Sequence, residues 1–340
     1  MEHTYKGKGG FAMIFEKKIL ELYSGILLRR MDNEQGVFYF SPEDFPGLQA
    51  HSYDFTAGAG HALCGYFYHY DNPIPGKLVV FDHGMGNGHR SYLREIEMLC
   101  RGGYLVYSYD HTGCMRSGGS NVGGFAQSLH DLDDCITALK REPALQGRSM
   151  AVMGHSWGGF STMNIVKYHP ELTHVVSMSG FTCVEQMLRQ ELRGILKPYI
   201  PAVLELERKN NPGYADSCAV ACLKKTDAKV LLIYSGDDKT VRRKMHYDPL
   251  YQALSGRENI RFLLLKDKNH NPTYTPEAVV YKNAFWDTLQ KKWKKGLLAT
   301  KEAQAAFMAR YDFLRMTCQD EKLWQIIYAH FGVRPYEADL

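Results

Sequence analysis

The stretch Met153-Gly154-His155-Ser156-Trp157-Gly158-Gly159 decides the fold. It follows an apolar run over 150–153 that is typical of a buried strand, and residues 160–168 after it have helical spacing. Residues 154–158 match G-x-S-x-G, in which a sharp turn from strand to helix exposes the serine hydroxyl. Glycines flank the serine because side chains there would collide with neighbouring backbone. The turn therefore predicts Ser156 as a nucleophile.

On both sides of this turn, short apolar runs alternate with longer helical patterns, which favours βαβ units and a largely parallel sheet. A meander precedes about six strands that are linked by crossovers. The predicted strands are 36–40, 65–69, 78–81, 104–109, 150–153, 175–178, 229–234 and 261–265, and the clearest helices are 92–99, 128–139 and 160–168.

The 340 residues divide into one core with two extensions. We expect a helical and strand extension over 1–49, a core over 50–298, and a helical extension over 299–340 packed on that core. Within the core, residues 181–227 separate two strands and have a helical pattern broken by prolines. An insertion of that size usually forms a lid, so we expect this cap to cover the site.

A serine hydroxyl needs an imidazole to take its proton and a carboxylate to orient that imidazole. In this strand order the acid and then the histidine should follow the serine at successive strand ends. Asp237 and Asp238 come after the strand 229–234, and His270 comes after the strand 261–265. We favour Asp238 as the acid because it stands three residues before Val241, which leaves Asp237 to cap the turn.

Catalysis at a carbonyl also requires N–H donors for the oxyanion. The Trp157 N–H begins the helix after the serine and benefits from the helix dipole. A second donor should come from the loop 82–88, where the Met85 N–H is our candidate. Gly84 lets this loop approach the substrate closely, and His83 is expected to hold the loop by hydrogen bonds.

In this order, H-G-x-G (83–86), G-x-S-x-G, the late aspartate and the final histidine resemble the α/β-hydrolase superfamily. Residues 154–159 are similar to the G-H-S-M-G-G of monoacylglycerol lipases, lysophospholipases and related serine esterases. The resemblance covers about residues 50–296. It implies the α/β-hydrolase fold, a mostly parallel central sheet flanked by helices, and it implies no metal and no organic cofactor.

We expect a serine hydrolase that cleaves a carboxylic ester with an apolar acyl or alcohol group through a Ser156 acyl-enzyme. Met187 and Leu188, in the cap, are candidates for lining the substrate pocket, although an apolar helix face is also what packing requires. Alternatives with the same triad are a thioesterase, a serine peptidase or an acyltransferase. A further alternative is a non-catalytic relative that binds a ligand.

Composition limits the partners and the compartment. The 41 basic and 37 acidic residues leave a charge of +4, which gives no reason to expect a nucleic-acid partner. Eight scattered cysteines indicate a reducing compartment, so we expect a cytoplasmic protein. No signal peptide is expected, and no apolar window approaches the roughly 18 residues of a membrane span. The partner is expected to be a small ester, and the oligomeric state is left open.

Overall fold

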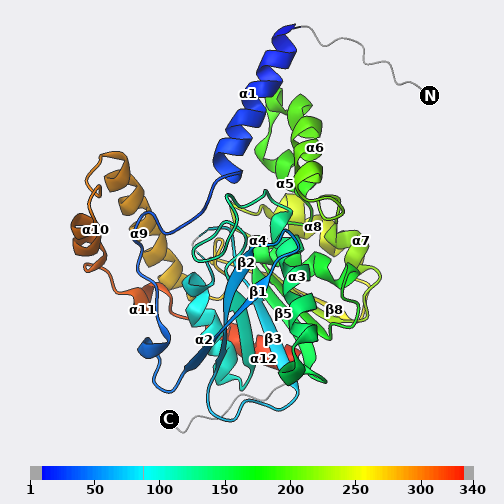
Figure 1. Ribbon diagram of the computed structural model, residues 1–340, viewed down its shortest axis with the longest axis vertical. Helices are drawn as coiled ribbons and strands as arrows, with labels where there is room; N and C mark the ends of the chain where they lie inside the picture. Colours follow the sequence, from blue (N-terminus) through cyan, green and yellow to red (C-terminus); the bar gives the residue numbers. More distant parts are fainter. Residues whose placement is uncertain (1–9, 87, 333–340) are drawn as a thin grey trace.

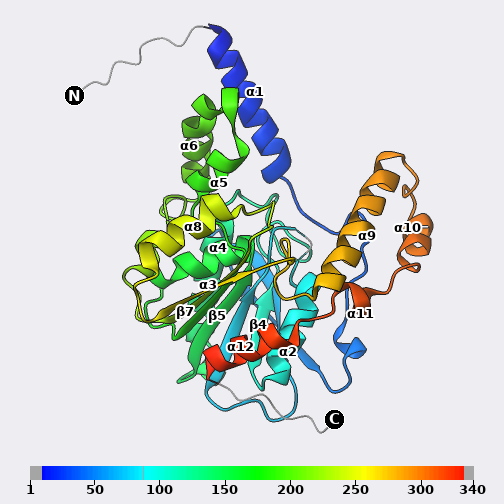
Figure 2. The same ribbon diagram turned by 180° about the vertical axis from the view of Figure 1, so that it is seen from behind.

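A computed structural model describes residues 10–86 and 88–332. Its centre is one sheet in the order β1-β2-β4-β3-β5-β6-β7-β8, with helices against both faces (Figures 1 and 2). The strands β3 to β8 are parallel, and β1 and β2 join antiparallel at one edge. The strands are β1 (Gln49–Thr56), β2 (Ala62–His69), β3 (Lys77–Asp82), β4 (Leu105–Tyr109), β5 (Ser149–His155), β6 (His174–Met178), β7 (Lys229–Ser235) and β8 (Ile260–Leu265).

Alternating side chains of the strands pack into two separate layers. Val79 and Phe81 of β3 join the cluster formed with α2 and α12, whereas Leu78 and Val80 join the cluster formed with α3, α4 and α8. The helices are α1 (Gly10–Leu27), α2 (Leu93–Arg101), α3 (Gln127–Arg141), α4 (Trp157–Asn164), α5 (Val184–Glu191), α6 (Ile200–Asn210), α7 (Ala219–Leu223), α8 (Arg243–Leu254), α9 (Pro276–Lys294), α10 (Lys301–Met308), α11 (Phe313–Met316) and α12 (Glu321–Phe331).

The register of the parallel strands places the candidate site at one edge of the sheet. Asp82 at the end of β3 pairs with Gly154 of β5, and Ser235 at the end of β7 pairs with Leu265 of β8. The loops that follow these four strands therefore emerge side by side. This is the edge at which ligands bind in open parallel sheets.

The predicted parallel strands are confirmed, and the first predicted strand is wrong. Residues 36–40 form no strand because they pair with no neighbouring strand; instead they run past the carboxyl edge of the sheet. The antiparallel edge strand is β1, whose pattern of exposed and buried residues was not recognised in the sequence.

Residues 181–227 pack beside the N-terminal helix. In both views α1, α5 and α6 project together from one side of the sheet (Figures 1 and 2). Glu207 of α6 anchors this group, because its buried carboxylate accepts hydrogen bonds from the Tyr23 hydroxyl of α1 and from the Phe125 and Ala126 N–H groups. The helical insertion is thus tied to α1 and to the segment before α3.

The C-terminal residues form two separate contacts with the rest of the chain. Phe285 and Leu289 of α9 are buried in a small cluster with Phe307 and Met316 of α10 and α11. Beyond them α12 returns to the sheet and buries Trp324 completely. Across the described ranges 10–86 and 88–332, we find no helix with the length and apolar character needed to cross a membrane.

Candidate active site

Ser156 occupies a strained turn between β5 and α4. Its backbone angles are φ 57° and ψ −109°, a region that non-glycine residues rarely adopt. A Cβ atom on Gly154 would lie 2.3 Å from the Gly158 carbonyl oxygen, and one on Gly158 would lie 2.0 Å from the Asp82 carbonyl oxygen. Backbone crowding therefore accounts for both glycines of G-x-S-x-G.

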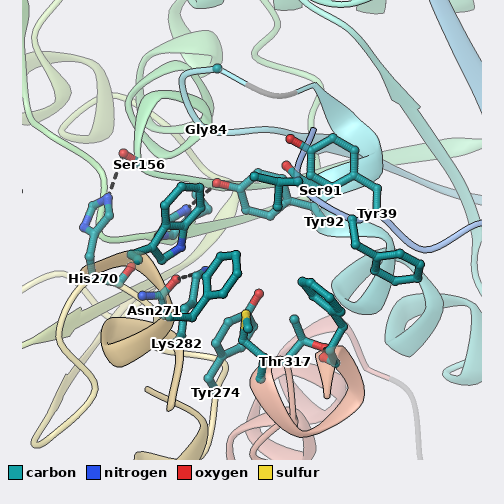
Figure 3. Close-up of a pocket in the computed structure, with 18 of the residues that line it drawn as sticks. Tyr39, Gly84, Ser91, Tyr92, Ser156, His270, Asn271, Tyr274, Lys282 and Thr317 are labelled. Carbon is teal, nitrogen blue, oxygen red and sulfur yellow. Dashed lines mark hydrogen bonds between the residues drawn. The ribbon is translucent and has the colours of Figure 1, made fainter. Parts of the chain in front are cut away.

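The structure brings Ser156, His270 and Asp238 together. The distance from Ser156 Oγ to His270 Nε2 is 2.9 Å (Figure 3). The distance from His270 Nδ1 to Asp238 Oδ2 is 2.8 Å. In this geometry Nδ1–H donates to the carboxylate, which leaves Nε2 free to accept the serine proton. The three groups can thus act as nucleophile, base and orienting acid.

The two adjacent aspartates have different partners. Asp238 is buried, and its Oδ1 accepts the Thr240 and Val241 N–H groups at 2.8 and 3.0 Å. Those bonds fix the carboxylate so that Oδ2 faces His270. Asp237 is exposed and accepts the N–H of Asn269. The geometry therefore favours Asp238 as the acid, whereas Asp237 stabilises the turn by accepting a backbone hydrogen bond.

Gly84 and Met85 line the same pocket as Ser156. A Cβ atom on Gly84 would lie 3.4 Å from Ser156 Cβ and 2.3 Å from the Tyr92 hydroxyl, so the loop approaches the serine closely. Trp157 is the first residue of α4, and a first-turn N–H has no partner within its own helix. The Met85 and Trp157 N–H groups stay our predicted oxyanion donors.

His83 and His155 hold the active-site loops. The Nδ1–H of His83 donates to the Gly84 carbonyl at 2.6 Å, and its Nε2 accepts the His111 N–H at 3.0 Å. His155 accepts the Tyr92 hydroxyl at Nδ1 and donates from Nε2 to the His270 carbonyl at 2.6 Å. Burial lowers the pKa of His83 to about 3 and holds the pKa of His155 well below its usual value. The contact between His155 and His270 could not be predicted from the sequence, because the two residues are 115 positions apart.

A pocket of about 440 Å³ opens beside Ser156 and His270 (Figure 3). That volume is in the lower part of the range for small-molecule sites. Its walls come mainly from the segment 37–40, from α9 and from residues 313–317. The aromatic lining residues are Phe38, Tyr39, Phe40, Tyr92, Tyr274, Phe285, Trp286 and Phe313. The pocket thus combines the catalytic edge and residues 90–92 with segments that precede β1 and follow β8.

The structure places neither Met187 nor Leu188 at this pocket, contrary to our expectation. Leu188 is buried in the main core, and Met187 packs against that core. No residue of the expected cap, 181–227, lines this pocket, and the apolar faces of its helices pack into the main core. On the same helix, the Gln190 side-chain amide donates a hydrogen bond to the Thr240 carbonyl.

A buried ionic cluster of Asp82, His111 and Asp131 lies next to the turn that carries Ser156. His111 lies between two carboxylates, 3.1 Å from Asp82 Oδ1 and 3.2 Å from Asp131 Oδ2. Burial alone would lower the pKa of His111, but the charge of Asp82 and the hydrogen bonds to Asp131 and Asp82 raise it to about 10. The His111 ring also contacts the ring of Trp157, at 4.8 Å between centroids. The cluster therefore links Asp82, at the start of the loop 82–88, to α4.

Replacing His111 by leucine is expected to lower the free energy of unfolding by about 3–5 kcal/mol, because two buried carboxylates lose their cation. A group whose pKa rises on folding stabilises the protein fully below its unfolded pKa, about 6.5, and loses that effect as pH rises through about 10. Urea denaturation at pH 6 and pH 10 measures both effects. His51→Leu, on the surface, is the control; equal losses of stability in the two variants would contradict the prediction.

Within the ranges 10–86 and 88–332, no group of three or more His, Cys, Asp or Glu side chains is arranged to hold a metal ion. The free cysteines there are Cys64, Cys100, Cys114, Cys135, Cys183, Cys218, Cys222 and Cys318.

The model of a protein family described as "Serine aminopeptidase, S33" matches residues 73–266, more than half of the chain. The match includes Ser156 and Asp238, and His270 lies just beyond its end. The mouse acylamino-acid-releasing enzyme is 25% identical over 235 residues, which are 62% of this chain and 30% of that protein. This chain thus spans less than a third of the length of that relative.

Solved structures with the same fold include esterases and other hydrolases. An esterase from Pyrococcus furiosus superposes with a TM-score of 0.56 at 17% identity, covering 79% of this chain and 98% of the esterase. The α/β-hydrolase GrgF from Penicillium sp. sh18 gives a TM-score of 0.53 at 13% identity, with coverage of 72% and 98%. These similarities show the α/β-hydrolase fold.

Proposed function

The chain belongs to the serine aminopeptidase S33 family of α/β-hydrolases, and from this premise we propose that it is an esterase acting through a Ser156 acyl-enzyme. The observation that carries the proposal is the hydrogen-bonded series Ser156–His270–Asp238 at the mouth of an aromatic-walled pocket. The substrate is a small carboxylic ester whose apolar part lies against those walls.

In the proposed reaction, Ser156 Oγ attacks the ester carbonyl while His270 Nε2 takes its proton. The negative oxygen of the tetrahedral intermediate accepts the Met85 and Trp157 N–H groups. His270 then gives the proton to the departing alcohol, and the acyl group stays on Ser156. Water, deprotonated by the same imidazole, releases the acid and restores the serine.

Amide cleavage is the second candidate, because one relative is named an acylamino-acid-releasing enzyme. The same triad can expel an amine, since His270 would protonate the departing nitrogen in the same way. The free thiols of the described residues support a reducing, cytoplasmic location for either activity.

A panel of an ester, a thioester and an anilide separates these activities. We expect the purified protein to cleave 4-nitrophenyl butyrate with a higher kcat/KM than the butyryl thioester or an N-acetyl-aminoacyl 4-nitroanilide. Turnover of 4-nitrophenyl esters should fall for long acyl chains, because the pocket is small. A preference for the anilide would instead favour the peptidase. Absence of turnover on every substrate would favour a binding protein.

A further inference from the structure

An ammonium group lies in the candidate pocket beside the catalytic histidine. Lys282 of α9 lines the same cavity as Ser156 and His270. Its Nζ donates to Asn271 Oδ1 at 2.7 Å and lies 4.6 Å from the centroid of the Tyr274 ring. Figure 3 shows Lys282 next to Asn271, the residue that follows His270. The lysine thus reaches the region where a substrate bound at Ser156 would extend.

This cation has only neutral partners in the structure. Among residues 10–86 and 88–332, no carboxylate oxygen lies within 4.0 Å of Lys282 Nζ, the distance at which the two groups would form an ion pair. The carboxylate that influences it electrostatically is Glu95, a buried group whose Oε1 accepts the Thr273 hydroxyl. Burial lowers the pKa of Lys282 to about 8, and the charge of Glu95 opposes this shift. The amine is therefore mostly protonated at pH 7.

The other charged residue that lines the pocket, Arg90, adds to its positive electrostatic potential. Arg90 is exposed at the pocket, and its guanidinium donates to the Phe40 carbonyl at 3.2 Å. Neither aspartate nor glutamate occurs among the described residues that line the cavity. A substrate with a free amino terminus would bring a third positive charge into this pocket and meet no carboxylate. A negatively charged group would meet two cations.

We propose that Lys282 binds a carboxylate of the substrate. The proposal rests on the proposed function and narrows its substrate class to esters that carry a carboxylate near the scissile carbonyl. The ammonium offers three donors, one of which is used by Asn271, so a carboxylate can be added without breaking a contact. The aromatic side chains of Tyr274 and Trp286 would cover the carbon chain that joins the substrate carboxylate to the scissile carbonyl.

Pairs of substrates in which a carboxylate replaces a neutral group test the proposal. For the acyl side, 4-nitrophenyl butyrate is compared with 4-nitrophenyl hemisuccinate; for the alcohol side, 4-acetoxybenzamide is compared with 4-acetoxybenzoate. The wild-type protein should prefer the carboxylate member of at least one pair, roughly 10- to 100-fold in kcat/KM, as expected for a hydrogen bond to a charged group. The pair that shows the preference identifies which half of the ester carries the carboxylate.

Three variants distinguish binding from a structural role. In Lys282→Met the ratio of kcat/KM between the carboxylate ester and its neutral counterpart should fall to about 1, a ratio in which any loss common to both esters cancels, and Lys282→Arg should retain part of the preference. Lys291 is an exposed lysine on the same helix, and Lys291→Met should leave kcat/KM unchanged for both the carboxylate and the neutral esters. Equal losses on charged and neutral esters in Lys282→Met would overturn the proposal, because the lysine would then act only by positioning Asn271 and His270.

The proposed function and this inference fail in different ways. A wild-type protein that hydrolyses neutral esters without any preference for the carboxylate members would overturn the role of Lys282 and leave the esterase proposal intact. Absence of turnover on all four substrates, with no labelling of Ser156 by a fluorophosphonate, would overturn both.

Discussion

Ser156→Ala is expected to lower kcat/KM for 4-nitrophenyl butyrate by at least about 10⁴-fold, because no other group can form the acyl-enzyme. Folding should be unaffected. Ser156 is only partly buried, its backbone N–H still donates to the Met178 carbonyl, and alanine removes a single oxygen. Ester hydrolysis measures the activity, and thermal denaturation compares the stability of the two proteins.

A second serine in the same pocket provides the control for this variant. Ser91 also lines the cavity, but its hydroxyl donates to the Gly88 carbonyl at 2.8 Å and forms no hydrogen bond with an imidazole of the described residues. Ser91→Ala should keep kcat/KM within a few-fold of the wild type. Comparable activity in Ser156→Ala and wild type would remove the serine from the mechanism.

Asp238→Asn is expected to lower kcat by roughly 10³- to 10⁴-fold. The Asp238 Oδ1 position accepts two backbone N–H groups, so an asparagine oxygen would occupy it and the amide NH₂ would face His270. Nδ1 would then accept rather than donate, and Nε2 would carry the proton. An imidazole in that tautomer cannot take the proton of Ser156, although the geometry of the site would be kept.

The same substitution at the neighbouring aspartate, Asp237, serves as the control for Asp238→Asn. Asp237→Asn keeps an oxygen that can accept the Asn269 N–H, so kcat should change by no more than a few-fold. Steady-state kinetics of both variants at pH 7, with circular dichroism to verify folding, measures the difference. A large loss in Asp237→Asn with activity retained in Asp238→Asn would exchange the two roles.

The catalytic edge could be predicted because its residues follow strands whose patterns are strong. Ser156, Asp238 and His270 each come directly after an apolar run, and parallel strands bring their carboxyl ends to one edge of the sheet. The prediction therefore needed only the order of the strands. The choice between Asp237 and Asp238 was made from a spacing of three residues, and the contacts of the two carboxylates agree with that choice.

The pocket could not be predicted because its walls are remote in sequence. Residues 36–40 have the composition of a strand, but they lie against the pocket and contribute Phe38 and Tyr39. Met187 and Leu188 have the same helical spacing whether a helix faces a ligand or a core. A lysine such as Lys282 on an amphipathic helix is typical of a solvated face. Only the contacts of Lys282 with Asn271 and Tyr274 show that it enters the cavity.

The most direct test of Ser156 as the activated nucleophile is covalent labelling with a fluorophosphonate, followed by mass spectrometry of the digested protein. Attack by Ser156 Oγ on phosphorus expels fluoride and leaves a stable phosphonyl group on the serine. We predict one adduct, on the peptide that contains Ser156, which is lost in Ser156→Ala and strongly slowed in Asp238→Asn. A protein that stays unlabelled, or an adduct on another residue, would contradict the account.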